Sequence, residues 1–184
     1  MSTIRSIMQS RLADTWISHY SGDAHPSKLF EGVKFRLDIV IGKGGGPFRL
    51  WTTKYMKWFA DERPHLFDRI SYVSASPALW YLGLFPKVGD EVHLSVLKKL
   101  LARSPMSEAV QERGTTIYVH RVITMFVKCF DFVPYFRNAS EGRKKSEDYK
   151  PFAFASAGSA VTAAAAINSS SFFVYFVTFG DCFH

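Results

Sequence analysis

The sequence of 184 residues predicts a mixed α/β chain with two segments, residues 1–80 and residues 81–184. Runs rich in β-branched and aromatic residues, which favour strands, alternate with runs of helical period. Hydrophobic residues make up 47% of the chain and charged residues 21%, so the chain can bury a sizeable core. The composition changes near residues 77–90, and this change places the boundary between the segments.

The first segment begins with a predicted helix over residues 3–18, because its apolar residues recur at helical spacing. These residues are Ile4, Ile7, Met8, Leu12 and Trp16. A β-rich stretch over 33–41 predicts a strand, and residues 42–47 form a glycine loop. The alternation that starts at Phe48 predicts a second strand. A short helix over 54–59, a turn from Pro64 and a strand over 70–73 complete the segment.

The second segment begins with a predicted helix over about 93–103, which the Ser104-Pro105 pair ends. Residues 114–136 are dense in β-branched and aromatic residues and predict strands. The polar, charged stretch 137–150 predicts a mobile loop. One helix or two follow, over about 159–179.

The charge balance favours polyanionic partners such as nucleic acid. Lys and Arg number 23 against 16 Asp and Glu, which gives a net charge of +7. Cys129 and Cys182 lie far apart, and no C-x-x-C, H-x-x-x-H or H-E-x-x-H spacing occurs, so neither a zinc site nor a disulfide framework is predicted. The N-terminus has no apolar core of a signal peptide, which favours the cytoplasm.

Residues 151–180 contain no charged side chain and could by length span a bilayer. Their middle is rich in small and polar residues, and no cationic flank follows them. A buried helix is therefore the preferred interpretation, with no membrane partner. A membrane-associated protein anchored by this stretch is the weaker alternative.

The stretch LDIVIGKGGGP, residues 37–47, has the glycine content of a cofactor loop. A cofactor loop opens a helix, whereas residues 48–53 alternate like a strand. Pro47 occupies the place of the third glycine in the dinucleotide fingerprint, and no phosphate-loop lysine follows. The sequence therefore predicts a glycine-rich hairpin between two strands, not a cofactor site.

Three stretches resemble adenine-specific DNA methyltransferases of restriction-modification and phage-defence systems, the type IIG enzymes and their relatives. HPSKLFEGVKFRLDIVI at residues 25–41 is similar to their R-P-S-K-L-F-E-G-V-x-Q-R-L segment. TTKYMKW and ERPHLF follow within residues 52–67, and INSSSFFVYFVTFGDCFH at residues 167–184 resembles their N-S-S-L-F-Y-W-Y-W…D-C-R-H helix. The chain departs from the family pattern at Phe35, Asp38 and Phe183.

The resemblance implies the last strands of a Rossmann-like catalytic domain in residues 1–80 and the start of a mixed target recognition domain in residues 81–184. It implies that the glycine loop joins two late antiparallel strands. The family's S-adenosyl-L-methionine motif and Asn-Pro-Pro-Tyr-type motif are absent, so we expect a fragment that is inactive alone and has no catalytic residue. The parent, not this chain, would bind S-adenosyl-L-methionine. The alternative is a stand-alone DNA-binding specificity subunit that partners a separate catalytic chain.

Double-stranded DNA is the expected partner, together with the missing N-terminal catalytic part. The candidate DNA contacts are basic residues near aromatics, one basic cluster and one asparagine. They are Lys28, Arg36, Lys54, Lys57, Arg143, Lys144, Lys145 and Asn168. Each candidate has a structural alternative: a solvated face for Lys54 and Lys57, a surface pair with Glu31 for Arg36, and a helix cap for the Asn168 stretch. Glu141, Glu147 and Asp148 lie near the cluster of Arg143, Lys144 and Lys145 and dilute its positive charge.

Overall fold

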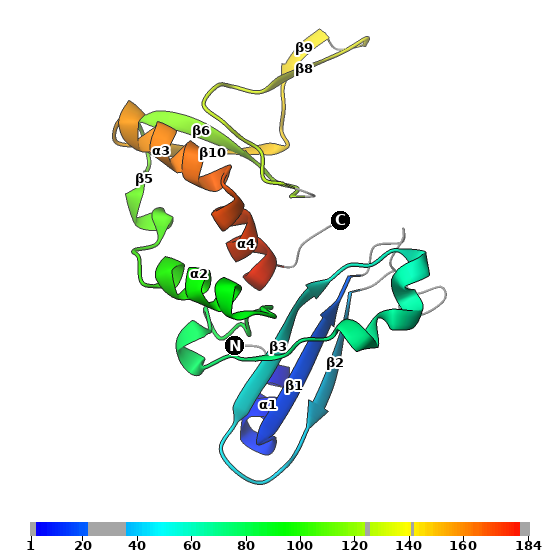
Figure 1. Cartoon of the computed structure of the whole chain (residues 1–184). Coiled ribbons are helices and arrows are strands. Elements are labelled where there is room, and N and C mark those ends of the chain that lie inside the picture. Colours follow the sequence, from blue (N-terminus) through cyan, green and yellow to red (C-terminus); the bar gives the residue numbers. More distant parts are fainter. Residues whose placement is uncertain (1–2, 22–35, 124–125, 141, 181–184) are drawn as a thin grey trace. The chain divides into compact units, whose positions relative to one another are not determined.

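The computed structural model describes residues 3–21, 36–123, 126–140 and 142–180, and it shows a mixed α/β chain (Figure 1). The chain forms two compact units. Unit 1 comprises Met1–Leu101 and Val177–Asp181, and unit 2 comprises Ala102–Phe176 and Cys182–His184. The units therefore divide after Leu101, whereas the sequence places its boundary after residue 80. Most of the first stretch that resembles methyltransferases, 25–35, lies outside the described residues.

The chain begins with a helix that is shorter than the sequence predicts. Helix α1 covers Thr3–Arg11, and strand β1 follows at Asp14–Tyr20. The prediction of one helix over 3–18 is therefore wrong for residues 14–18, which belong to β1. Trp16 and Ile17 have strong strand preference, and their pairing with two neighbouring strands outweighs the helical spacing of the apolar residues.

Unit 1 contains a four-stranded sheet in the order β2-β1-β3-β4. Strand β2 covers Leu37–Gly42, β3 covers Arg49–Met56 and β4 covers Val73–Ser74. The central strand β1 runs antiparallel to β2 and parallel to β3. The predicted strands at 33–41 and from Phe48 are confirmed within the described residues.

The glycine loop does not make a hairpin, because β1 lies between the two strands that the loop joins. Its backbone instead closes around the junction of α1 and β1. The Ala13 amide donates to the Lys43 carbonyl over 2.6 Å, and the Arg49 amide donates to the Ala13 carbonyl over 3.0 Å. Gly46 has a φ of 135°, which favours glycine at this bend. The hairpin prediction failed because a glycine-rich connection does not by itself specify which strands pair.

Short 3-10 helices and one α-helix complete the described part of unit 1. They are η1 Ala60–His65, η2 Phe67–Arg69, η3 Pro77–Leu79 and α2 Glu91–Leu101. The predicted helix over 54–59 is wrong, because β3 continues to Met56. The predicted helix over 93–103 is confirmed by α2. Tyr20, Trp58 and Leu66 form one buried cluster, and Ile17 and Leu50 belong to another.

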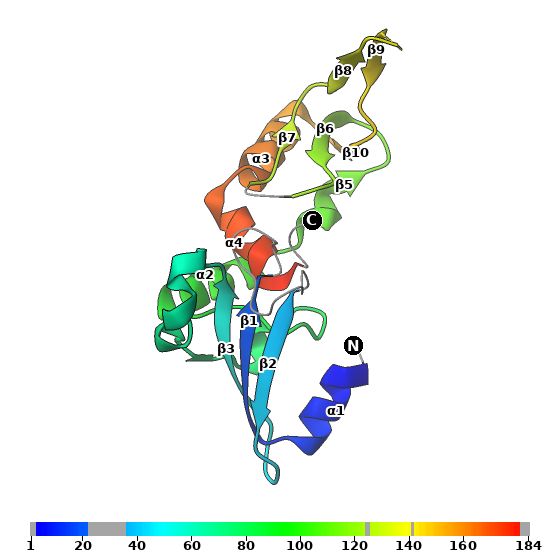
Figure 2. The same ribbon diagram turned by 90° about the vertical axis from the view of Figure 1, so that its right-hand side faces the viewer.

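Unit 2 contains a second four-stranded sheet in the order β5-β10-β6-β7. Helix η4 at Met106–Ala109 precedes it. The strands are β5 Val110–Gln111, β6 Thr115–His120, β7 Cys129–Phe130 and β10 Tyr149–Phe154. Ile117, Phe154 and Ala163 form part of the core that joins this sheet to α3, which covers Ala157–Ile167. Figures 1 and 2 show α3 against one face of the sheet.

The predicted loop over 137–150 is wrong, because most of it is strand. Strand β8 at Tyr135–Asn138 pairs antiparallel with β9 at Gly142–Lys145. Gly142 adopts a φ of 71° where the turn enters β9. The polar composition concealed the hairpin, because both of its faces are exposed and no apolar alternation marks its strands.

The described part of the chain ends in two helices, α3 and then α4 at Ser170–Phe179. The sequence predicted one helix or two over this stretch, and the structure has two. Ser156 caps α3, because its hydroxyl accepts a hydrogen bond from the Ser159 amide over 3.1 Å. Among the described residues no single helix is long and apolar enough to cross a membrane. The pair α3 and α4 reaches that length and composition together, with a bend of 63° between them.

Candidate nucleic-acid interface

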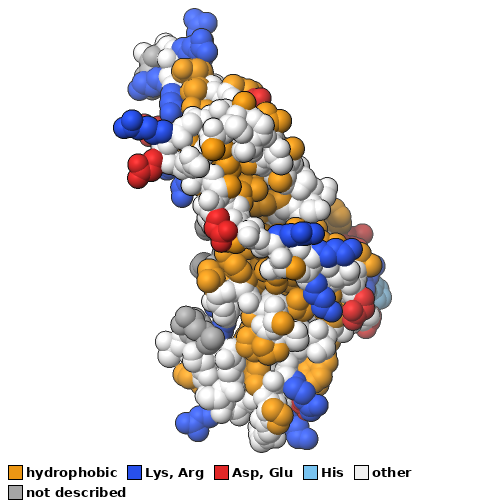
Figure 3. All heavy atoms as spheres, turned by 90° about the vertical axis from the view of Figure 1, so that its left-hand side faces the viewer, with side chains coloured by type: hydrophobic (Ala, Val, Ile, Leu, Met, Phe, Trp, Pro, Cys, Tyr) orange, Lys and Arg blue, Asp and Glu red, His pale blue; other side chains and the backbone are white. Residues whose placement is uncertain are grey.

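The β8–β9 hairpin brings three of the predicted DNA contacts together. Arg143, Lys144 and Lys145 follow one another along β9, and all three side chains are exposed. Because strand side chains alternate, Arg143 and Lys145 share one face and Lys144 lies on the other. Figure 3 shows Lys and Arg side chains gathered around this hairpin at the top of the view.

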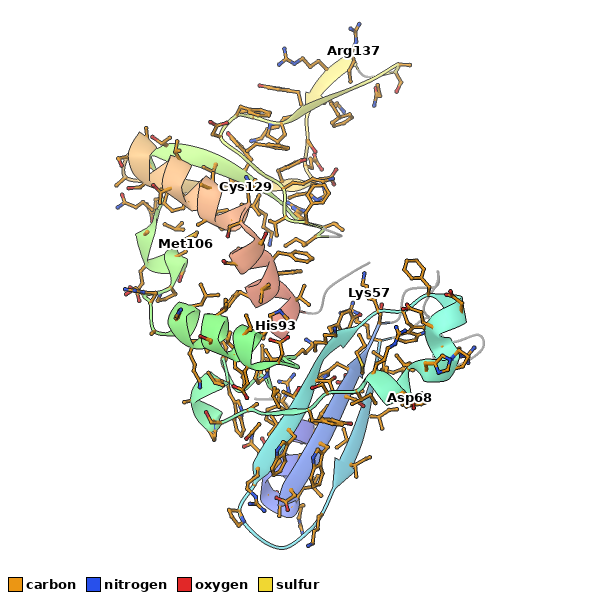
Figure 4. All side chains as sticks on the ribbon, in the orientation of Figure 1. Lys57, Asp68, His93, Met106, Cys129 and Arg137 are labelled. Atoms are coloured by element: carbon orange, nitrogen blue, oxygen red, sulfur yellow. The ribbon has the colours of Figure 1, made fainter. Side chains whose placement is uncertain are left out.

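The cross-strand register adds Arg137, which the sequence analysis missed, to the same face. Arg137 lies directly opposite Arg143, and Tyr135 lies opposite Lys145. Figure 4 shows Arg137 on the hairpin, with its side chain directed away from the strands. Opposed like charges disfavour a cross-strand pair, and a bound anion would relieve that repulsion. The signal that could have identified Arg137 is Gly142, a turn glycine that sets the two arginines in register.

Aromatic rings hold two of these cations in place. The Arg143 guanidinium lies 4.2 Å from the centre of the Tyr135 ring, and the Lys145 ammonium lies 5.3 Å from the centre of the Tyr118 ring. Such contacts fix long side chains without neutralising their charge. The Ser146 amide donates to the Pro134 carbonyl over 2.9 Å and closes the base of the hairpin. The face therefore presents ordered cations to solvent.

Asn168 has a structural role in β7 pairing. Its side-chain oxygen accepts from the Cys129 amide over 3.0 Å, and its side-chain nitrogen donates to the Cys129 carbonyl over 2.9 Å. Asn168 also ends α3 as its C-cap. The cap of α4 is the next residue, because the Ser169 hydroxyl accepts from the Phe172 amide over 3.2 Å. The expected helix cap in this stretch is thus Ser169, and Asn168 joins a helix end to a strand edge.

The remaining candidates belong to unit 1 or lie outside the described residues. Lys54 is exposed on β3 and lines a hollow of about 270 Å³ together with Asp90. Lys57 follows β3 and is exposed (Figure 4), and Arg36 precedes β2 and is half-buried. Lys28 lies outside the described residues. The DNA contacts predicted for these four residues stay predictions.

A buried polar network crosses the sheet of unit 1. His19 is 4% exposed; its Nδ1 lies 2.8 Å from the Asp38 carboxylate and its Nε2 lies 2.9 Å from the Thr52 hydroxyl. Desolvation alone would raise the pKa of Asp38, but the hydrogen bond with His19 and nearby positive charges lower it. The order carboxylate, imidazole, hydroxyl matches that of a hydrolase triad. Thr52 is 0% exposed, so no substrate reaches its hydroxyl, and the network stabilises the sheet.

This network gives Asp38 a role at a position where the chain departs from the methyltransferase pattern. Asp38 lies directly opposite His19 in the β1–β2 register. A carboxylate at this position accepts a hydrogen bond from a histidine on the adjacent strand. The other two departures, Phe35 and Phe183, lie outside the described residues.

The Cys129 thiol is buried at 5% exposure. Burial and the nearby Asp131 carboxylate raise its pKa to about 11, so it stays protonated and is a poor nucleophile at neutral pH. Within the described ranges, no three His, Cys, Asp or Glu side chains are grouped so that they could hold a metal ion.

The β8–β9 hairpin of unit 2 brings four exposed cations together on two short strands. In unit 1, His19 and Thr52 direct their polar groups to partners within the sheet. One face of the hairpin presents Arg137, Arg143 and Lys145, and Lys144 lies on the other. Comparison of the chain with family models, with curated proteins and with solved structures found no match.

Proposed function

We propose that this chain is the DNA-binding part of an adenine-specific DNA methyltransferase of a restriction-modification or phage-defence system. It would supply the late strands of a Rossmann-like catalytic domain and the start of a target recognition domain, and it would act in the cytoplasm. The three stretches of sequence similarity support this assignment. The missing N-terminal catalytic part would bind S-adenosyl-L-methionine and transfer its methyl group to the amino group of an adenine.

The observation that carries the proposal is the basic face of the β8–β9 hairpin. The major groove of DNA admits a two-stranded β-ribbon, and this hairpin is such a ribbon. Its face bears Arg137, Arg143 and Lys145, which suit phosphate oxygens and the acceptor edge of guanine. Lys144, on the opposite face of the hairpin, would contact the phosphates of the DNA backbone that border the groove.

The glycine loop supports the assignment of the cofactor to the parent enzyme. Residues 43–48 lead into strand β3 and no helix begins there, so the loop lacks the helix N-terminus that a nucleotide site uses. The loop's backbone groups bond to Ala13 and Asp14 instead. We expect methyl transfer only when an upstream reading frame with the glycine motif and the Asn-Pro-Pro-Tyr motif is expressed together with this chain.

The test is a titration of the purified chain with a fluorescently labelled duplex at several salt concentrations, alongside labelled S-adenosyl-L-methionine. We expect salt-sensitive duplex binding without cofactor binding. Each of the changes Arg137→Ala and Arg143→Ala should lower the slope of log affinity against log salt by about one. Lys98→Ala, which removes an exposed charge from α2, is the matched control. Saturable cofactor binding by this chain alone, or no duplex binding at low salt, would refute the proposal.

A further inference from the structure

The sheet of unit 2 has two chemically different faces. One face packs its apolar side chains against α3, with Ile117 and Phe154 at 0% and 2% exposure. The opposite face carries four half-buried aromatic residues. Tyr118 pairs with Phe130 and Tyr149 pairs with His120, so these four rings project from the same face, which we call the outer face.

The rings of the outer face form a continuous cluster. The Tyr149 ring centre lies 4.8 Å from that of His120 and 5.5 Å from that of Phe130. Phe132 stacks on Phe130 with ring centres 4.9 Å apart and planes inclined by 21°. Phe132 is 58% exposed, so the cluster ends in a flat ring that a planar ligand could reach.

Cations border this cluster. The Lys145 ammonium lies 5.3 Å from the centre of the Tyr118 ring. Lys128, whose ammonium lies 5.4 Å from the centre of the separate Phe126 ring, lines the same hollow as Phe130 and Tyr149. Residues 115–154 contain seven Lys and Arg residues against four Asp and Glu residues. Phe130, Tyr149 and Lys128 also line a hollow of about 590 Å³ at the edge of β7. The border therefore favours a polyanion, and the rings favour a planar, apolar group.

We propose that the outer face binds single-stranded nucleic acid, with unpaired bases stacked on Phe132, Phe130 and Tyr149 and phosphates next to Lys128 and Lys145. Stacking of bases on aromatic side chains within a basic groove is how proteins hold strands without base pairs. A duplex hides the faces of its bases, so this surface needs an unpaired segment. The proposal goes beyond the duplex binding assigned to the hairpin and does not depend on the methyltransferase assignment.

The experiment uses the whole chain and a single-stranded oligodeoxynucleotide that contains one 5-iododeoxyuridine. Irradiation should crosslink the base to Phe130, Phe132 or Tyr149, as identified by mass spectrometry of the digested chain. An oligonucleotide of the same length with abasic sites keeps the phosphates and removes the bases. We expect it to bind about five- to a hundredfold more weakly than the oligonucleotide with bases.

Variants separate stacking from folding. Phe132→Leu should weaken single-strand binding about fivefold or more and leave duplex binding by the hairpin unchanged. Phe59→Leu, which removes a ring that is 67% exposed in unit 1, is the control and should bind as the unchanged chain does. Equal affinity for the abasic strand, or crosslinks confined to residues outside the outer face, would overturn the proposal. Loss of duplex binding alone would refute the proposed function and leave this inference standing.

Discussion

The two sheets of this chain treat polar groups in opposite ways. In unit 1 the polar groups of His19, Thr52 and Thr53 are buried, and His19 on β1 is hydrogen-bonded to both threonines on β3. In unit 2 the buried face is apolar, while the charged and aromatic side chains of β6, β7 and the β8–β9 hairpin are half-buried or exposed. Buried polar groups that satisfy each other specify a fold, whereas exposed cations and rings remain available to a ligand. We therefore expect the polar residues of the first sheet to stabilise the fold, and we propose that those of the second bind a ligand.

The largest expected effect comes from Gly114, which precedes β6 with a φ of 146°. A Cβ at this position would overlap the Phe154 carbonyl oxygen and lie 2.9 Å from the carbonyl carbon. We expect Gly114→Ala to lower the free energy of unfolding of unit 2 by about 3 kcal/mol or more, measured by urea titration with far-UV circular dichroism. Gly142→Ala is the control, because a Cβ there meets no described atom within 4 Å. A loss of only about 1 kcal/mol at both glycines would contradict the expected clash.

The next effect tests the buried network of unit 1. Thr52→Val keeps the side-chain volume but leaves His19 Nε2 buried without its partner. We expect the free energy of unfolding to fall by about 2 kcal/mol, followed by tryptophan fluorescence, since all four tryptophans lie in unit 1. Thr162→Val on the exposed side of α3 should change stability by less than about 0.5 kcal/mol. Equal effects of the two changes would show that the network does not stabilise the sheet.

A smaller effect separates structure from binding at Asn168. Asn168→Ala removes both hydrogen bonds to Cys129, and we expect it to cost about 1–2 kcal/mol of unfolding free energy. The salt dependence of duplex binding should stay the same, because the side chain is engaged with β7. Asn138→Ala, at the chain's other asparagine, is the control for stability. A smaller slope of log affinity against log salt in Asn168→Ala would instead support the predicted contact between Asn168 and DNA.

The smallest effect is the pH dependence due to Asp38. Its pKa is lowered in the folded chain, so the carboxylate stabilises unit 1 above its unfolded pKa of about 3.9. That stabilisation is lost as the pH falls through the lower folded pKa. The carboxylate is more than half exposed, so we expect less than about 1 kcal/mol. The urea concentration at the midpoint of unfolding should decrease less between about pH 5 and 3 in Asp38→Asn than in the unchanged chain. Asp61→Asn should leave this decrease as it is.

The sequence was most informative where one face of an element is buried. Helix α2 and strand β3 were predicted because their apolar residues follow a single period and pack on one side. The β8–β9 hairpin was missed because neither of its faces is buried, so no period marks it. Trp16 was assigned to a helix because five apolar residues fit that spacing, and only the pairing with β2 and β3 shows it to be strand.

Site prediction followed the same rule. The basic cluster at Arg143 to Lys145 was visible as adjacent residues, but Arg137 joins it through cross-strand register, which composition does not encode. The outer face of the unit 2 sheet was invisible for the same reason, since its rings come from three strands. Asn168 was identified as a helix cap, but its pairing with Cys129 spans 39 residues and needs the fold.

The central position of β1 has a consequence for how the chain reaches its native state. Each partner of β1 lies far along the sequence: Ser18 and Ile39 are 21 residues apart, and Asp14 and Arg49 are 35 apart. Strand β1 lies between β2 and β3, so the two strands that the glycine loop joins do not pair with each other. Long loops must close before any pairing of this sheet is gained, whereas β8 and β9 meet across a short turn. The basic β8–β9 hairpin should therefore form early in refolding, and the sheet that holds the buried histidine should form late.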